Sequence, residues 1–427
     1  MTSLEATGTT ATGTTAAGPD TVGAQRRILT VLVISQIFSG AGLAAGVTVG
    51  ALLAQDMLGT TGLAGLPSAL FAAGSALAAI TVGRISQAKG RRPGLAAGYL
   101  AGAVGSAGVL AAAVLDQPVL LFLALFVYGA GTATNLQARY AGADLAAPAH
   151  RARAVSTVLV ATTLGGVVGP NLAAPTGALG AAFGIPYLAG PFLLAGAAYA
   201  LAALVLAVWL RPDPLLLART TADAHPDGPQ APTGKEADPS APGATSGGVV
   251  LGSLVMILTQ FVMVAIMTMT PVHMHDHGHG TAASGLVIAL HVGSMYLPSP
   301  LTGRLVDTRG RRTVAVASGI VLLAAGLLAA LAPADSVALL ALALALLGLG
   351  WNLGLVSGTA IITDAVPLAT RAKTQGTVDV AIAIAGATGG LASGLVVSAA
   401  SYPVLALTGG VLALALVPAI AATARSR

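Results

Sequence analysis

The chain alternates between long apolar runs and short polar breaks. The apolar runs are close to the ~20 residues that a helix needs to cross the hydrocarbon core of a bilayer. The pattern predicts twelve membrane-spanning helices, six on each side of a long polar interruption. The first six are expected at residues 28–54, 64–83, 93–115, 118–140, 154–175 and 187–210, and the second six at 249–272, 282–303, 313–332, 336–362, 374–399 and 402–424.

Two of the polar breaks have nearly the same sequence. Residues 83–92 follow the second run and residues 303–312 follow the eighth, and their matching glycines and arginines lie 220 residues apart. Residues 144–153 and 364–373 repeat at the same offset. This spacing indicates an internal duplication, so we expect an all-α membrane protein built from two pseudo-symmetric halves of six helices. The motif residues are Gly83, Arg84, Gly90, Arg91 and Arg92 in the first copy and Gly303, Arg304, Asp307, Gly310, Arg311 and Arg312 in the second.

The composition fits a membrane protein and excludes several functions. The chain is 55% hydrophobic and 8% charged, whereas soluble domains are about 25% charged. It has no cysteine, which excludes disulfides, thiolate metal sites and a cysteine nucleophile. No Gly-x-x-x-x-Gly-Lys-Ser/Thr pattern occurs, so an ion gradient rather than ATP is expected to drive transport, and no cofactor is expected.

The positive charges predict how the chain is oriented in the membrane. All 20 Lys and Arg residues, with Arg139 counted in the loop after the fourth helix, fall on breaks of the same side. This distribution predicts two cytoplasmic termini and anchoring to a cell membrane rather than binding to nucleic acid. Residues 1–27 are expected to be a disordered tail without a signal peptide, residues 211–248 a disordered cytoplasmic linker, and residues 425–427 a short tail.

The repeated break resembles a known signature. Its pattern Gly-x-x-x-Asp-x-x-Gly-Arg-Arg, between the second and third spans, is similar to the loop typical of the major facilitator superfamily. The resemblance covers about the whole chain and implies a substrate cavity between two halves that rock to open it alternately. The first copy has Gln87 where the family usually has an acid, and the second copy has Asp307. We expect both loops to act as cytoplasmic gates, whose arginines reach helix ends or carboxylates such as Asp144 and Asp364.

A second resemblance concerns the direction of transport. Residues 165–174 in the fifth predicted span are similar to the Gly-x-x-x-Gly-Pro-x-x-Gly-Gly motif of proton-coupled exporters, through Gly165, Gly169 and Pro170. Proline bends a helix and the glycines permit close packing, so the motif is either a pivot or a simple packing kink. The leading function is proton-coupled export of small organic compounds. The alternatives are an importer, a facilitator, a metal-ion carrier of the same fold, or a transporter-like sensor.

Two ionisable residues lie clearly within predicted spans and are candidates for proton coupling, Asp379 and His291. An ionisable side chain in the membrane is costly, so it is a functional candidate by default. Asp379 could instead pair with Arg371 or Lys373 at the membrane rim, and His291 could be a hydrogen-bonded interior residue. The arginine frequent in the family's fourth span has no counterpart at residues 120–127. The sequence shows no cluster of His with Asp, Glu or Ser in one cavity-facing region, so we do not expect an enzyme.

Neutral polar residues are candidates for contact with a small-molecule substrate. The resemblance places Gln36 and Gln260 at the cavity, and Asn135, Asn171 and Asn352 could join them. Each could instead make a hydrogen bond between helices. The histidine-rich loop at residues 273–279 could hold a metal ion, sense pH or simply be solvated. We expect a monomer.

Overall fold

The computed structural model describes residues 19–58, 66–224 and 244–425. Over these residues the protein is helical and has no strand. The helices before residue 225 are α1 (Pro19–Leu58), α2 (Leu66–Lys89), α3 (Arg91–Val114), α4 (Pro118–Ala143), α5 (Arg151–Asn171), α6 (Ala173–Ala182), α7 (Pro191–Trp209) and α8 (Pro214–Ala224). Those after residue 243 are α9 (Ala244–Asp276), α10 (Thr281–Tyr296), α11 (Ser299–Arg309), α12 (Arg311–Leu331), α13 (Val337–Ala365), α14 (Arg371–Ala399), α15 (Tyr402–Ala413) and α16 (Leu416–Arg425).

Apart from the short helix α8, the helices of the described residues form twelve rods, because three pairs of helices follow one another with only a short break. The pairs are α5 with α6, α10 with α11, and α15 with α16. In the described residues, ten helical stretches are long and apolar enough to cross a membrane. The two expected spans outside that set, 154–175 and 282–303, correspond to the interrupted rods α5–α6 and α10–α11. The expected all-helical membrane fold is confirmed, and its helix count agrees approximately.

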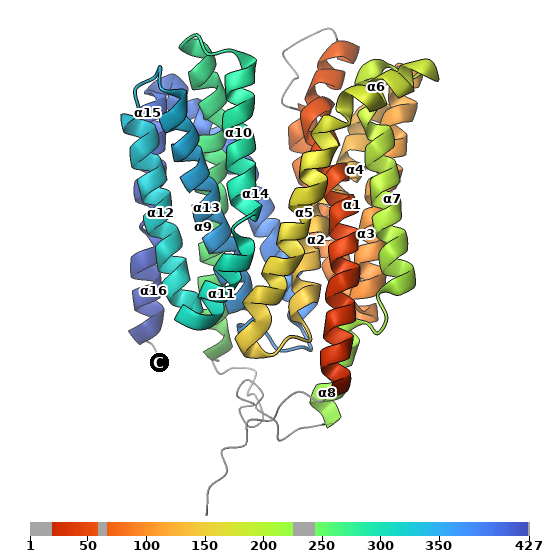
Figure 1. Ribbon diagram of the computed structural model, residues 1–427, viewed down its shortest axis with the longest axis vertical. Helices are drawn as coiled ribbons and strands as arrows, with labels where there is room; N and C mark the ends of the chain where they lie inside the picture. Colours follow the sequence, from red (N-terminus) through yellow and green to blue (C-terminus); the bar gives the residue numbers. More distant parts are fainter. Residues whose placement is uncertain (1–18, 59–65, 225–243, 426–427) are drawn as a thin grey trace, which may run out of the picture.

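The two predicted halves are separate bodies in Figure 1. Helices α1 to α7, the first half, pack around one buried apolar core, and α9 to α16, the second half, pack mainly around another. The second core also takes in Ala152, Val155 and Leu159 of α5, so the halves share buried surface. Figure 1 shows the halves close together at the lower end, near α11, and further apart at the upper end. We call the lower end, which carries both motif copies, the basic end.

Each motif copy forms a tight turn between two helices. Gly90 joins α2 to α3 with φ 98°, and Gly310 joins α11 to α12 with φ 93°. A positive φ is strained for residues with a Cβ, which explains why glycine stands at both positions. The repeated sequence therefore produces the same local turn in both halves.

The structure differs from the sequence-based boundaries in two places. Helix α1 begins at Pro19 and takes in Arg26 and Arg27, which were expected in or next to a disordered tail. Helix α8 occupies part of the expected linker and buries Leu215. Residues 244–248 of the expected linker belong to α9, and residues 1–18, 225–243 and 426–427 lie outside the described residues.

Helix α8 forms because its first residues carry a start signal. Asp213 precedes Pro214, and Asp is a favoured N-cap while Pro is favoured at the first helical position. Asp213 Oδ1 accepts hydrogen bonds from the N–H groups of Leu215 and Leu216 at 3.0 and 3.2 Å. Asp213 Oδ2 accepts from Arg92 N–H at 2.7 Å, which fastens the start of α8 to the start of α3. The expectation of a disordered linker therefore does not hold for residues 214–224.

Candidate functional site

A buried ion pair joins the two halves, between the last part of α4 and the first part of α14. Arg139 of α4 donates through Nη2 to Asp379 Oδ1 of α14 at 2.7 Å, and the two side chains are 0% and 3% exposed. Tyr140 lies beside the pair, where its hydroxyl donates to Asp379 Oδ1 at 3.2 Å and accepts from Arg139 Nη2 at 2.9 Å. Burying a charge is costly unless the charge is paired and hydrogen-bonded, and Asp379 meets both conditions at Oδ1.

Arg139 is a correction to the sequence analysis, which counted it as a loop cation. Helix α4 continues to Ala143, one turn beyond Arg139, and buries the whole side chain. The signal was present in the sequence, because the residues at 140–143 are aromatic or small and do not interrupt a helix. The pairing also differs from the expected rim partners of Asp379, since Arg139 rather than Arg371 or Lys373 contacts its carboxylate.

The oxygens of Asp379 have different surroundings. Oδ1 accepts from both Arg139 and Tyr140, whereas the buried Oδ2 has no hydrogen-bond partner among the described residues. Arg139 is held independently, because Nε donates to Thr359 Oγ1 at 3.1 Å and Nη1 donates to Leu136 O. Its guanidinium carbon also lies 4.2 Å from the centre of the Tyr140 ring, a cation–π contact. One carboxylate oxygen is therefore anchored and the other is not, and a proton-coupling role for Asp379 stays a prediction.

His291 lies inside the second half. Its side chain is fully buried in α10, and its Nδ1 lies 2.8 Å from Leu344 O of α13. In the described part of the chain its Nε2 is buried without a hydrogen-bond partner. This arrangement matches the interior-histidine alternative, and a coupling role for His291 stays a prediction.

The two motif arginines make equivalent ion pairs at the basic end. Arg91 pairs with Asp144 at 2.7 Å, and Arg311, 220 residues later, pairs with Asp364 at 2.5 Å. Their burial differs, since both side chains of the first pair are 0% exposed and both of the second are 28% exposed. The second pair is therefore the one that solvent and salt can reach.

Each of these aspartates also contacts an arginine of the opposite half. Asp144 lies 3.9 Å from Arg371 Nη1 of α14, and Asp364 lies 2.5 Å from Arg151 Nη1 of α5. Arg151 and Arg371 are again equivalent in the repeat. Two related networks thus close the basic end. In each network, a single aspartate contacts arginines of both halves.

Asp307 and Gln87 occupy the same position in the two motif copies, and each binds the start of a helix in the opposite half. Asp307 accepts from the N–H groups of Ala152 and Arg153, the second and third residues of α5, at 3.2 and 3.1 Å. Burial raises the pKa of the Asp307 carboxyl, and the hydrogen bonds from these two N–H groups act in the opposite direction. Gln87 takes the equivalent place in the first copy and accepts from the N–H groups of Ala372 and Lys373 of α14.

The first glycine of each motif copy lies where helices of the two halves cross. A Cβ at Gly83 would lie 2.9 Å from Ala372 O and 3.1 Å from Gly376 Cα. A Cβ at Gly303 would lie 2.5 Å from Ser156 Oγ and 2.8 Å from the oxygen of Ala152, which corresponds to Ala372 in the repeat. Glycine is therefore needed at both positions for the halves to meet.

Gln36 and Asn135 are buried within the first half. Gln36 Nε2 donates to Asn135 O and to Thr162 Oγ1, both at 3.1 Å, and Tyr99 donates to Gln36 Oε1 at 2.5 Å. Asn135 Nδ2 donates to Ser39 Oγ at 2.7 Å. These bonds connect α1, α3, α4 and α5, so both amides act as interhelical links in this conformation. Their contact with substrate stays a prediction.

The candidates of the second half divide into buried and accessible residues. Asn352 is buried and donates to Met295 O and Ser299 Oγ, each at 2.7 Å. Gln260 is partly exposed and accepts from Trp351 Nε1 at 2.8 Å. Tyr296 lies edge-on to Trp351, with ring centres 5.7 Å apart. Gln260 is therefore more accessible than Asn352, although its neighbour Trp351 is buried. Sequence reasoning did not single out Tyr296.

The exporter-like motif lies where the fifth rod is interrupted. Gly165 packs directly against the α1 backbone at Ile37 and Gly40, which leaves no room for a side chain. Helix α5 ends at Asn171, one residue after Pro170, and α6 begins at Ala173. Asn171 therefore lies at a helix end, and Gly169 lies in the last turn before the break.

The histidine-rich segment lies at the opposite end of the molecule from the motif copies. His273 stacks on Tyr402 with ring centres 4.4 Å apart and an interplanar angle of 13°, and His277 lies 4.4 Å from His273. These side chains line a pocket of about 390 Å³. Across the described residues, no group of three His, Cys, Asp or Glu side chains is placed to hold a metal ion.

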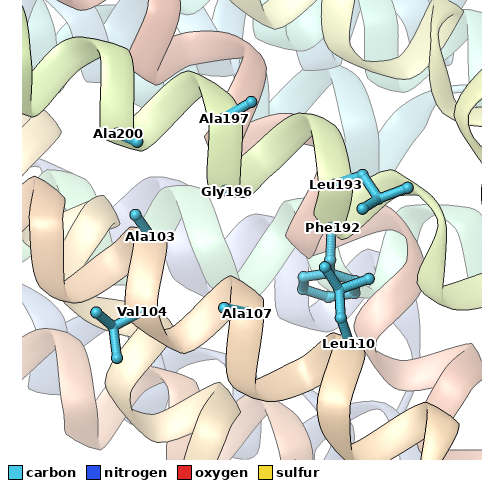
Figure 2. A pocket seen from close by; sticks show the side chains of 9 residues that line it. All are labelled: Ala103, Val104, Ala107, Leu110, Phe192, Leu193, Gly196, Ala197 and Ala200. Atoms are coloured by element: carbon cyan, nitrogen blue, oxygen red, sulfur yellow. The ribbon is translucent and has the colours of Figure 1, made fainter.

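A second pocket, of about 410 Å³, lies between α3 and α7 (Figure 2). Ala103, Ala107, Gly196 and Ala200 leave it shallow, and all nine residues that line it are apolar or glycine. It has no side chain that could orient a polar compound or move a proton. The ion pair between the halves is therefore the stronger candidate for function.

Comparisons with known proteins agree with this geometry. A family model described as Major Facilitator Superfamily matches residues 31–296 and 250–426. The uncharacterized MFS-type transporter YdeG of Bacillus subtilis (strain 168) is 57% identical over 397 residues, which cover 92% of this chain and 91% of that protein. The riboflavin transporter RfnT of Brucella anthropi is 31% identical over 360 residues, covering 83% and 85%. The crystal structure of the human organic anion transporter MFSD10 (TETRAN) has the same fold, with a TM-score of 0.74 at 17% identity over 93% of this chain and 99% of that one.

Proposed function

The chain belongs to the major facilitator superfamily of membrane transporters, and we propose that it exports small organic compounds in exchange for protons. The proposal makes Asp379 the proton-binding group and the basic end a gate that faces the cytoplasm. The observation that carries it is the buried pair between Arg139 and Asp379, because this pair joins the two halves that must separate during transport.

The coupling follows from the charge on Asp379. While the carboxylate is ionised, it holds α14 against Arg139 of α4 and the basic end stays closed. A proton on Oδ2 removes the charge that Arg139 binds, so the attraction between the halves falls. The basic end can then open, release the proton to the cytoplasm and admit substrate. Closure with Asp379 ionised again would carry the substrate outward.

The gate would be the two networks at the basic end. Closing that side brings Asp144 to Arg371 and Asp364 to Arg151, across the interface between the halves. Opening it breaks these cross-half contacts, whereas the contacts of Arg91 and Arg311 with the same aspartates lie within one half. The aspartates would therefore keep a partner in both conformations, which limits the cost of opening.

Export rather than import is supported by the fifth rod. Gly165 fits against the α1 backbone, and the rod is interrupted just after Pro170. Helix α5 is packed tightly before the break, and α6 starts a separate helix after it. The rod can therefore pivot at the break. The position of all the basic loops on one side supports a cytoplasmic location for the basic end.

A candidate substrate class comes from the relative that transports riboflavin. That protein is 31% identical, and this chain has Trp351, Tyr296 and the partly exposed Gln260 next to one another. Aromatic rings and an amide can bind a planar heterocycle with polar edges. Riboflavin is therefore the first compound to test as cargo.

Transport can be tested in proteoliposomes that enclose a pH-sensitive dye and receive labelled riboflavin outside. Because the driving gradient is imposed, either orientation of the protein can be assayed. We expect an imposed pH gradient to drive riboflavin against its concentration gradient, with protons moving the opposite way. Riboflavin flux that never exceeds equilibration, or protons that move in the same direction as riboflavin, would refute exchange.

A further inference from the structure

The two motif copies differ in the side chain that crosses to the opposite half. Gln87 and Asp307 are equivalent in the repeat, and each accepts two N–H groups at the start of a helix in the other half. An acceptor is all that this contact requires. Glutamine in the first copy would therefore be only a neutral replacement for the acid, unless its amide nitrogen makes contacts of its own.

The amide nitrogen of Gln87 does have separate partners. Its Nε2 donates to Leu368 O at 3.3 Å and to Ala369 O at 2.5 Å. Both carbonyls belong to the loop between α13 and α14 in the second half. A carboxylate has no hydrogen to donate and could not make either bond. Gln87 thus holds the start of α14 through its oxygen and the preceding loop through its nitrogen.

The linker helix strengthens this contact. Arg219 of α8 donates through Nη2 to Gln87 O at 3.0 Å and to Leu368 O at 3.3 Å. Because Asp213 fixes the start of α8 to Arg92, the linker helix belongs mechanically to the first half. Its bond to Leu368 is therefore a further link between the halves.

The surroundings of Asp307 are different. Its carboxylate faces the N–H groups of Ala152 and Arg153, and Arg153 Nε lies 3.7 Å from its Oδ2. Each of these contacts brings a donor or a positive charge to the carboxylate. An acid suits the second copy for this reason, and an amide suits the first.

We propose that Gln87 is a positioning residue that clamps the basic end shut through both its amide oxygen and its amide nitrogen, so that an acid at position 87 weakens the gate. The inference rests on the alternating opening proposed above. In Gln87→Glu the carboxylate loses both bonds to the loop. It also attracts the cationic Arg219 away from Leu368, so the linker helix loses its bond to the second half. The charged residues at the start of α14, Arg371 and Lys373, are cations and keep the new carboxylate ionised.

The clamp can be tested without a transport substrate. The chain has no cysteine, so Lys89→Cys and Arg309→Cys, two exposed and equivalent positions at the basic end, can carry a pair of spin labels in the full-length protein. Pulsed electron–electron double resonance in nanodiscs measures the distance between the two labels. The distance distribution gives the fractions of protein with the basic end closed and open. Gln87→Glu is compared with Gln87→Met, which removes every polar contact of the side chain, and with Gln117→Glu, the same change at an exposed position that makes no side-chain cap bond.

We expect the open fraction to rise several-fold in Gln87→Glu and further in Gln87→Met, and to stay unchanged in Gln117→Glu. A closed fraction in Gln87→Glu equal to or above that of the parent would overturn the clamp, as would an unchanged distribution in Gln87→Met. The experiment reports on positions of the halves alone. Failure of the riboflavin assay would therefore leave the clamp standing, and failure of the clamp would leave proton exchange at Asp379 untouched.

Discussion

Arg139 and Thr359 are equivalent positions of the internal repeat, and they touch each other. They lie 220 residues apart in the sequence, and Arg139 Nε donates to Thr359 Oγ1 at 3.1 Å. Two equivalent residues can meet only where the pseudo-twofold axis passes between them. The ion pair with Asp379 breaks the symmetry at that point, because the position equivalent to Asp379 in the first half is Leu159. The buried pair between Arg139 and Asp379 therefore has no counterpart at the equivalent positions of the other repeat.

Removing one member of this pair should destabilise the protein strongly. Arg139→Leu or Asp379→Leu leaves a buried charge without its partner, which costs about 3–5 kcal/mol in comparable cases. The double variant with leucine at both positions should recover most of the loss, because no charge remains. Thermal unfolding of the purified protein in detergent measures this. Additive losses in the double variant would show that the two side chains are not coupled.

Widening the helix crossings at the basic end should favour the open gate. Gly83→Ala places a methyl group 2.9 Å from Ala372 O, too close for the two backbones to keep their positions. Gly394→Ala is the matched control, because a Cβ there has nothing within 4 Å. The distance between spin labels at the exposed positions 89 and 309 should shift toward longer values in Gly83→Ala and stay unchanged in the control. Equal distance distributions would argue against Gly83 as a closure point.

The two gate arginines should respond differently to salt. Arg91 and Asp144 are fully buried, whereas Arg311 and Asp364 are each 28% exposed. Exposed pairs are screened by salt and buried pairs much less. Arg311→Ala should therefore lower stability by a small amount that vanishes at high ionic strength. Arg91→Ala should lower it several times more at every salt concentration. Melting temperatures of both variants in low and high salt give the comparison, and transport that is unchanged in both at normal expression would remove the gate role.

A test of Gln36 separates structure from substrate contact. Its amide is buried and bonded to Asn135, Thr162 and Tyr99. Gln36→Leu leaves these partners unsatisfied, at a cost of about 1–3 kcal/mol for each buried polar group that finds no other bond. The melting temperature should fall while riboflavin affinity, measured by tryptophan quenching, stays the same. Lost affinity at unchanged stability would instead assign Gln36 to the substrate cavity.

The sequence was sufficient for the helical architecture because apolar length and the 220-residue repeat are local signals. Gly90 and Gly310, for example, predict the same turn twice, and both turns have positive φ. The boundaries were less certain where a helix runs past the apolar stretch. Helix α1 begins at Pro19, a residue type favoured at the first helical position, and α4 continues to Ala143 beyond its apolar run.

The functional pairing could be predicted only in part. Asp379 was identifiable as a charge within an apolar run, but its partner Arg139 lies 240 residues away on another helix. The residues after Arg139 allow the helix to continue past it, but no local feature shows which carboxylate Arg139 contacts. The contacts of Gln87 were also beyond the sequence, because the carbonyls of Leu368 and Ala369 become available only through the fold. A glutamine that departs from a family pattern can thus have its own partners.

The most direct test of the account is the pH dependence of the gate in the parent and in Asp379→Asn. Spin labels at positions 89 and 309 report the open fraction of the basic end as pH falls from mildly alkaline to mildly acidic, with no substrate present. We predict that acidification opens the parent, that His291→Gln behaves like the parent, and that Asp379→Asn is already open and does not respond. An Asp379→Asn protein that remains closed, or that opens on acidification as the parent does, would contradict the central role of the pair between Arg139 and Asp379.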